Sequence, residues 1–288
     1  MMSGISGLSP VATYILDEKD EAKAATTYAK TDATVSNYVT SFENDASTIT
    51  SASALMKNYK ALAVVLGAYG LSSIQGETAL VKDLLTQDPT SSTSVAAKSG
   101  NATWLKFAKA FAAWNETSSS ASSTSSSTPF SDPTELESTV SSYEMSQYET
   151  SLESSDSTTG TVSGVGYALY FSRVMSGSMT LNDIMSDSKL LKVVETVSGF
   201  NPTEFGALDY DEQKRLLTKS VDLSDFSSSE KIQQYAERYL GMLQITPQTV
   251  TKTNTVLSLY GSDGSTDPAL SLFGLSSGST SLVSQLFG

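Results

Sequence analysis

The chain has 288 residues, enough for two small domains, and carries 18 basic against 31 acidic residues, a formal charge of −13. This acidic balance argues against binding to nucleic acid or to an anionic membrane, because both require clustered lysine and arginine. The sequence contains no cysteine and no histidine, which excludes disulfide bonds and removes the usual ligands of zinc and the usual side chain of acid–base catalysis.

Residues 1–17 predict an irregular, flexible N-terminus, because Gly4, Gly7 and Pro10 interrupt any helical period. No basic start is followed by an apolar run, so we expect no cleaved secretory signal. No stretch approaches the roughly 20 apolar residues that a membrane-spanning helix needs. Such a chain is expected to be either cytoplasmic or exported by a route that cleaves no leader.

A long helix is predicted from about Asp20. Apolar side chains recur there at spacings of four, seven, three and four residues, which places them on one helical face. They are Ala24, Tyr28, Val35, Tyr38 and Phe42. The charge run at 16–23 is interpreted as the solvated first turns of this helix.

The stretch KNYKALAVVLGAYGL (57–71) predicts the next helix. Gly70 stands where a left-handed residue is wanted after the helix end, and Leu71 can fold back as the hydrophobic contact of a Schellman cap. The apolar face of this helix is expected to comprise Leu55, Tyr59, Leu62, Val65 and Leu66.

Two further helices follow in the first half. Leu84 and Leu85 mark the third helix, which Asp88 and Pro89 end. The fourth carries an aromatic stripe whose helical spacing indicates core packing before ligand stacking. The stripe is Trp104, Phe107, Phe111 and Trp114.

The second half repeats this pattern. SDSKLLKVVETVSGF (186–200) matches 57–71 at an offset of 129 (186 − 57), and the aromatic helices match at 128 (232 − 104). Aligned glycines and aromatics predict two copies of one helical unit. The residues that we expect to be structural are Tyr38, Phe42, Leu62, Gly70, Trp104, Phe107 and Phe111, and then Tyr167, Phe171, Leu191, Gly199, Tyr235 and Tyr239.

The two copies are separated by TSSSASSTSSST (117–128), a composition typical of a flexible linker. A helix then begins with Asp132 as its cap, Pro133 at its first position and Glu135 in its first turn. It extends to about Leu152 and is polar around most of its circumference. We expect it to lean on one of the two copies.

The sequence therefore predicts an all-α protein with two duplicated helical-bundle domains, a Ser/Thr-rich linker and flexible termini. The expected division is 1–17, N-terminus; 18–114, first domain; 115–132, linker; 133–245, second domain; and 246–288, a Gly/Ser-rich apolar tail. Apolar clusters in such a tail are expected to dock on this chain or on a partner. They include Leu272, Phe273, Leu282, Leu286 and Phe287.

Two glycine-containing stretches resemble ligand loops only in part. Gly164 and Gly166 lack the third glycine and the preceding strand of a dinucleotide loop, so they indicate the start of a helix. GSDGSTDP (261–268) resembles the start of a calcium loop, but Gly274 stands where the twelfth-position glutamate is needed, which favours a turn.

The remaining polar candidates have structural interpretations. Asn101 and Asn115 begin glycosylation triplets, but we interpret them as residues that cap or follow helices. Asp209, Asp211 and Glu212 are interpreted as surface acids of a helix rather than as acid–base partners. We therefore expect no catalytic residue, no metal site and no cofactor.

Two helices resemble the signatures of one bacterial family. KNYKALAVVLGAYGL resembles its helix ending in aromatic-Gly-Leu, and AAKSGNATWLKFAKAFAAW (96–114) resembles its aromatic, Phe-Ala, Ala-Phe signature. With the pair Tyr38/Phe42, they look like the bacterial domain-of-unknown-function family twelve-seventeen. The resemblance covers about 36–114 well and 165–244 more loosely, because Ser198 replaces the aromatic residue before the glycine.

Membership of that family implies small helical units, often in tandem, encoded among alphaproteobacterial flagellar genes, with no established catalytic residues. We accordingly expect a non-enzymatic structural or assembly protein that contacts flagellar or export-apparatus proteins, either in the flagellum or exported through it. The alternative is a cytoplasmic chaperone or assembly factor for flagellar export substrates. A third hypothesis, an enzyme in an unfamiliar fold, is weakened by the missing histidine, cysteine and phosphate-binding loops.

Overall fold

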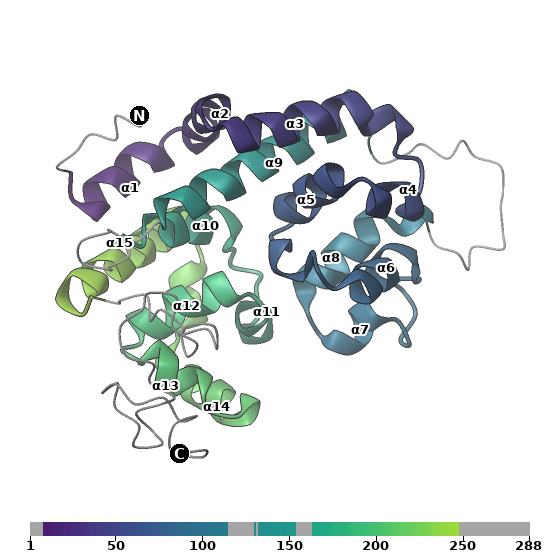
Figure 1. Cartoon of the computed structure of the whole chain (residues 1–288). Helices are drawn as coiled ribbons and strands as arrows, with labels where there is room; N and C mark the ends of the chain where they lie inside the picture. Colours follow the sequence, from purple (N-terminus) through teal and green to yellow (C-terminus); the bar gives the residue numbers. More distant parts are fainter. Residues whose placement is uncertain (1–7, 115–129, 131, 154–162, 248–288) are drawn as a thin grey trace, which may run out of the picture. The chain divides into compact units, whose positions relative to one another are not determined.

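The computed structural model describes residues 8–114, 130, 132–153 and 163–247, and every regular element in these ranges is a helix (Figure 1). Contacts divide the chain into two units, 1–248 and 249–288, and all described residues belong to the first. None of the helices in these ranges is long and apolar enough to cross a membrane. The residues outside them include most of the expected linker and the tail residues Leu272, Phe273, Leu282, Leu286 and Phe287.

The N-terminal region contains a helix where the sequence predicted an irregular segment. α1 (Pro10–Glu18) starts with Pro10 at its first position, and the Ser9 hydroxyl accepts a hydrogen bond from the backbone N–H of Ala12 at 3.3 Å. Proline suits this position because no intrahelical partner exists there for an N–H. The prediction of an irregular, flexible 1–17 is therefore wrong from Pro10 onward, and Tyr14, 1% exposed, anchors the helix.

The long helix predicted from Asp20 is two helices, α2 (Glu21–Thr31) and α3 (Ala33–Asp45). Asp32 separates them in an extended conformation, and its Oδ1 accepts hydrogen bonds from the N–H groups of Thr34 and Val35, both at 2.9 Å. The apolar spacing continues across the break, which explains why the two helices read as one.

A second break divides the next predicted helix into α4 (Ala52–Lys57) and α5 (Tyr59–Ala68). Asn58 caps α5 by accepting a hydrogen bond from the N–H of Ala61 at 3.1 Å. Tyr59 is 64% exposed, so its predicted place on the apolar face is wrong. The physical reason is the turn at Asn58, which takes Tyr59 out of register with Leu55.

The end of α5 is the predicted Schellman cap. Gly70 has φ +72°, the N–H of Leu71 donates to the carbonyl of Leu66 at 2.7 Å, and the N–H of Gly70 donates to that of Gly67 at 3.0 Å. Leu71 is buried, as the hydrophobic contact of this motif requires. The prediction made from a glycine followed by an apolar residue is confirmed at this position.

α12 (Ser188–Val197) ends in the same way. Gly199 has φ +80°, and the N–H of Phe200 donates to the carbonyl of Glu195 at 2.9 Å. The other helices are α6 (Thr78–Thr86), α7 (Val95–Ser99), α8 (Ala102–Ala110), α9 (Pro133–Leu152), α10 (Val165–Val174), α11 (Leu181–Ser186), α13 (Pro202–Gly206), α14 (Tyr210–Ser220) and α15 (Ser229–Ile245).

Buried side chains form two hydrophobic clusters. Lobe 1 denotes residues 33–114, which surround a cluster that includes Phe42, Phe107 and Phe111. Lobe 2 denotes residues 163–245, which surround a cluster that includes Phe171 and Tyr239. α1 also packs into the second cluster, and α2 contributes to both.

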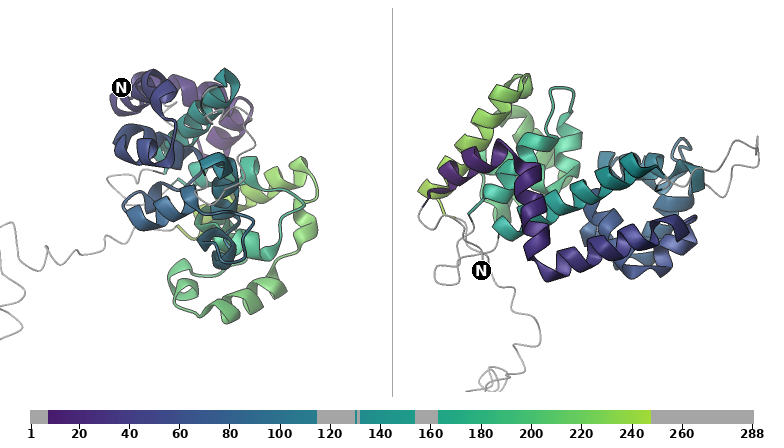
Figure 2. Two further views of the ribbon diagram at one scale, coloured as in Figure 1. Left: turned by 90° about the vertical axis from the view of Figure 1, so that its right-hand side faces the viewer. Right: turned by 90° about the horizontal axis from the view of Figure 1, so that it is seen from above.

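α9 joins the two lobes (Figures 1 and 2). Tyr143, at the middle of α9, lies in the cluster of lobe 1, and Tyr148, near the end of α9, lies in the cluster of lobe 2. The expectation that this helix leans on one copy is therefore wrong. The buried residues of α9 include the polar residues Glu144, Ser146 and Glu149. Because these positions are polar, the sequence of α9 has no apolar face that would predict burial against both lobes.

Two glycines allow neighbouring helices to approach α9 closely. A Cβ added at Gly67 on α5 would lie 2.6 Å from the Tyr143 ring, and one added at Gly166 on α10 would lie 2.0 Å from the backbone oxygen of Glu149. Both distances are shorter than van der Waals contact. Only a residue without a side chain permits α10 to lie this close to α9.

Candidate functional site: a polar cleft between the lobes

A cleft of about 290 Å³ opens between lobe 1 and lobe 2. Lobe 1 contributes the end of α5 and the start of α8, lobe 2 contributes α10, α11 and the start of α12, and α9 adds Ser146. The lining residues of lobe 1 are Gly67, Ala68, Tyr69, Gly70, Ala102, Thr103 and Lys106. Those of lobe 2 are Tyr170, Arg173, Val174, Met179, Asp183, Asp187 and Leu190.

The lobe 2 wall is organised around Asp187. Its Oδ1 caps α12 by accepting hydrogen bonds from the N–H groups of Lys189 and Leu190 at 2.9 and 3.1 Å, and its Oδ2 accepts one from the Tyr170 hydroxyl at 2.5 Å. Burial, together with the Asp187 carboxylate, raises the pKa of Tyr170 well above its usual value. Tyr170 is therefore a neutral donor that holds α10 to the start of α12.

Behind this wall lies an ion-pair network centred on Glu149. The Glu149 side chain is 1% exposed. Its Oε1 accepts from Nε of Arg173 at 3.2 Å, and its Oε2 lies 3.5 Å from Nζ of Lys189. Both cations also lie over the Tyr170 ring, at 5.4 and 4.5 Å from its centroid. The buried carboxylate thus binds two cations that the aromatic ring holds in place.

Asn101 joins the lobes at the rim of the cleft. Its Oδ1 caps α8 by accepting from the N–H of Trp104 at 3.0 Å, and its Nδ2 donates to the carbonyl of Ser186 at 3.2 Å. The interpretation of Asn101 as a helix cap is confirmed. The second bond connects lobe 1 to the end of α11, which no sequence pattern indicated.

The glycine loop and the acidic cluster have the structural roles that the sequence predicted. Gly164, with φ +76°, immediately precedes α10, as expected for the start of a helix. Asp209 caps α14, and Glu212 on the same helix accepts from Nε of Arg215 at 2.8 Å at the surface. Asn115, the stretch 261–268 and Gly274 lie outside the described residues.

The residues expected to be structural lie in the two clusters or at helix ends. Those that are buried are Phe42, Leu62, Phe107, Phe111, Phe171, Tyr235 and Tyr239. Those that are half-buried against the clusters are Tyr38, Trp104, Tyr167 and Leu191. The ring centroids of Phe107 and Phe111 are 4.9 Å apart, and Tyr69 packs edge-on against Phe107 at 5.2 Å.

Sequence reasoning did not find the network of Glu149, Arg173 and Lys189. Each of these residues stands on a separate helix, and α9 read as polar on nearly every side. A glutamate and an arginine 24 residues apart carry no spacing signal. Only the packing of α10 on α9, and of α12 on α10, brings the three residues together. Within the described ranges, no group of three or more acidic residues is placed to hold a metal ion.

Comparison with known proteins places this fold in a family. The family DUF1217, described as a protein of unknown function, matches residues 68–232, which is 165 of the 288 residues and includes parts of both lobes. None of the curated proteins matches the chain.

A solved structure is similar in fold. It is the X-ray crystal structure of protein AGR_C_984 from Agrobacterium tumefaciens, a structural genomics target, with 22% identity and a TM-score of 0.59. The similarity covers 81% of this chain and 92% of that one. At this identity the likeness concerns the fold, and the family match carries the assignment: the chain belongs to the DUF1217 family.

Proposed function

We propose that this protein is a non-enzymatic component of the bacterial flagellum or its export apparatus and acts by contact with other proteins. One observation carries the non-enzymatic part: the acidic groups that line the cleft or lie behind its wall hold helices together. Asp187 caps α12 and binds Tyr170, Glu149 binds two cations, and Asp183 closes the capping box of α11. These structural roles support the proposal that the protein acts through its shape and surface rather than through a reactive group. The resemblance described above supports the flagellar part.

Large apolar side chains on the surface are the proposed contact points. Ile15 and Leu16 are 41% and 50% exposed on α1, while Tyr14 beside them is buried. Further exposed apolar side chains are Leu8, Leu208, Tyr210, Leu223 and Ile245. When a partner covers apolar surface of this kind, the free energy of the complex falls, because apolar area is removed from water.

We also infer that the two lobes descend from one duplicated helical unit. Asn58 and Asp187 cap α5 and α12, both ten residues long, at the offset of 129 found in the sequence (187 − 58). The glycines after these helices, Gly70 and Gly199, are both left-handed. Two similar lobes could present two equivalent faces to a repeating assembly.

The location of the protein in cells tests the main proposal. We expect it in the medium or in sheared flagella of a motile strain, and we expect this signal to vanish when the export ATPase is deleted. Deletion of the gene should reduce motility. Recovery in the cytosol alone, together with unchanged motility of the deletion strain, would overturn the proposal.

The cleft favours a second candidate, a cytoplasmic chaperone for flagellar export substrates. A volume of about 290 Å³ accommodates one or two large side chains of an extended segment. Thr103→Trp would fill this space, whereas Thr218→Trp on exposed α14 would not. A chaperone should capture an unassembled export substrate in a pull-down and lose it only in the Thr103 variant. Equal capture by both variants would exclude the cleft as the binding site.

A further inference from the structure

The N-terminal arm, defined as α1 and α2 (residues 10–31), brings a second carboxylate to the network behind the cleft. Glu21 is the first residue of α2, and its Oε2 lies 3.7 Å from the Arg173 Nε that donates to Glu149 at 3.2 Å. Two carboxylates therefore compete for one guanidinium, and Glu149 has the shorter contact. The Glu21 side chain is 12% exposed, and its Oε1 is buried with no hydrogen-bond partner among the described residues.

Among the described residues, Arg173 is the cation that pairs with Glu21, and the other ionisable groups nearby are acids and tyrosines. α9 contributes Glu149 and the hydroxyl of Tyr148, α10 contributes Arg173, and α1 contributes Asp17, whose Oδ2 accepts from Tyr148 at 2.8 Å. Lys189 reaches Glu149 from α12. An ionised Glu21 would therefore be buried beside other carboxylates, which is costly, whereas a protonated Glu21 is neutral and can donate to Glu149.

We propose that Glu21 is protonated when the N-terminal arm is docked on α9 and α10, and that its ionisation releases the arm, so that pH controls arm docking. Burial, with the nearby Glu149, raises the pKa of Glu21 to about 7. A carboxyl whose pKa is higher in the docked form binds its proton more tightly there. The equilibrium constant for docking is then largest at low pH. It falls by up to tenfold per pH unit until about pH 7 and changes little above that.

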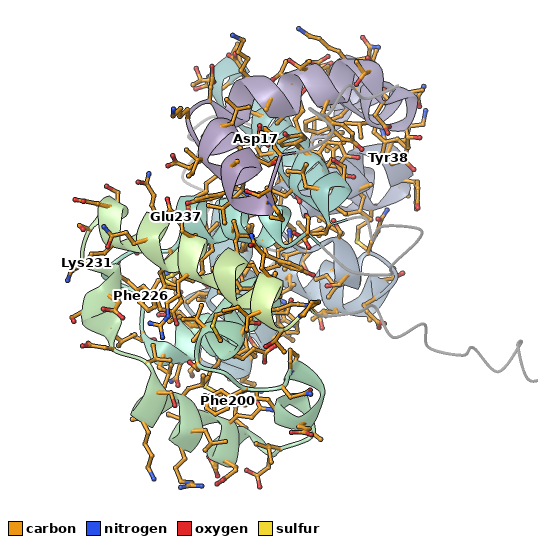
Figure 3. The ribbon with its side chains drawn as sticks, turned by 90° about the vertical axis from the view of Figure 1, so that its left-hand side faces the viewer. Asp17, Tyr38, Phe200, Phe226, Lys231 and Glu237 are labelled. Atoms are coloured by element: carbon orange, nitrogen blue, oxygen red, sulfur yellow. The ribbon has the colours of Figure 1, made fainter. Side chains whose placement is uncertain are left out.

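The arm is attached to the rest of the chain by a few buried side chains and by several polar contacts. The buried side chains of α2 are only Ala25 and Ala29. α1 adds Tyr14, which is buried in the cluster of lobe 2 and whose hydroxyl lies 2.6 Å from that of Ser172. Thr26 of α2 donates to Glu144 at 2.8 Å. α1 also packs against α15. Asp17 on α1 and Glu237 on α15 are labelled in Figure 3. Apart from Tyr14, the buried side chains of the arm are small, and hydrogen bonds to carboxylates supply part of the attachment, so one added charge at Glu21 should weaken docking.

Hydrogen–deuterium exchange of the full chain at pH 5 and pH 8, corrected for intrinsic exchange rates, tests this proposal. Amides of residues 10–31 should lose on the order of 100-fold protection between the two pH values. Amides of α5, in lobe 1, are the internal reference and should change much less. Equal losses in α5 and the arm would show a global effect and overturn the proposal, as would arm protection that does not change with pH.

Glu21→Gln, which is neutral and nearly the same shape, should keep the arm protected at both pH values. Glu43→Gln on α3, which replaces an exposed glutamate, should behave as the unmodified chain does. If the arm of the Glu21 variant still loses protection as the unmodified arm does, Glu21 is not the controlling group and the proposal fails. The test does not depend on the proposed function, because it reads exchange within the purified chain.

Discussion

Gly166→Ala tests whether α10 lies against the backbone of α9 as closely as the structure indicates. Gly166 is the second residue of α10, and an added Cβ would lie 2.0 Å from the Glu149 carbonyl oxygen and 2.8 Å from its carbonyl carbon. Backbone atoms cannot rotate aside as a side chain can. Relief of the clash therefore requires the two helices to separate by about 1 Å.

The cost combines overpacking with the bonds that the separation strains. Overpacking in a dense core costs about 1–3 kcal/mol. Separation of α9 from α10 also stretches the Glu149–Arg173 pair and the hydrogen bond from the Tyr167 N–H to Glu153 Oε1, at 2.9 Å. We expect a loss of about 3 kcal/mol in the free energy of unfolding, which lowers Tm by about 6–12 °C for a domain of this size.

Gly241→Ala is the matched control for this measurement. Gly241 lies inside α15, and nothing is within 4 Å of the position that its Cβ would occupy. Alanine should raise the free energy of unfolding there by up to about 1 kcal/mol, because glycine is a poor helix former. Thermal unfolding followed by circular dichroism compares the two variants. If Gly166→Ala melts at or above the temperature of the unmodified chain, the close approach of α9 and α10 is wrong.

Three further predictions concern the cores, the cleft rim and a buried acid. Phe107→Ala and Tyr235→Ala should each cost about 3–5 kcal/mol in urea unfolding, and an unchanged midpoint for either would refute its core assignment. Asn101→Ala should lower the free energy of unfolding by about 1 kcal/mol, because the cap of α8 is lost. Asn37→Ala, at an exposed site, should change it by less than about 0.5 kcal/mol. Equal effects of the two substitutions would contradict the capping role. Burial raises the pKa of Glu195 to about 7, although the nearby Lys192 acts in the opposite direction. Because this carboxyl binds its proton more tightly in the folded chain than in the unfolded chain, the free energy of unfolding should fall as pH rises from about 4.5 to 7. Glu195→Gln should remove about 1–2 kcal/mol of that loss, and an unchanged pH profile of unfolding would show that Glu195 does not contribute.

The helical content and several helix ends were predictable because they depend on residues close together in the sequence. A glycine followed by an apolar residue is enough to predict the cap at Gly70, since all its hydrogen bonds lie within one turn. Asp132 and Pro133 begin α9 for the same local reason. The helix breaks at Asp32 and Asn58 were missed, because an aspartate or asparagine inside an apolar period reads equally well as a surface residue of one continuous helix.

The site required the tertiary structure. Whether Glu149 is a solvated surface acid or the centre of a buried network depends on Arg173 and Lys189, which other helices bring to it. The free energy of a charge depends on what surrounds it in space, and this surrounding is absent from the local pattern. Spacing along the chain establishes which segments are helical and where several of them end. Packing alone places α9 between two lobes, leaves a cleft beside it and surrounds Glu21 with carboxylates.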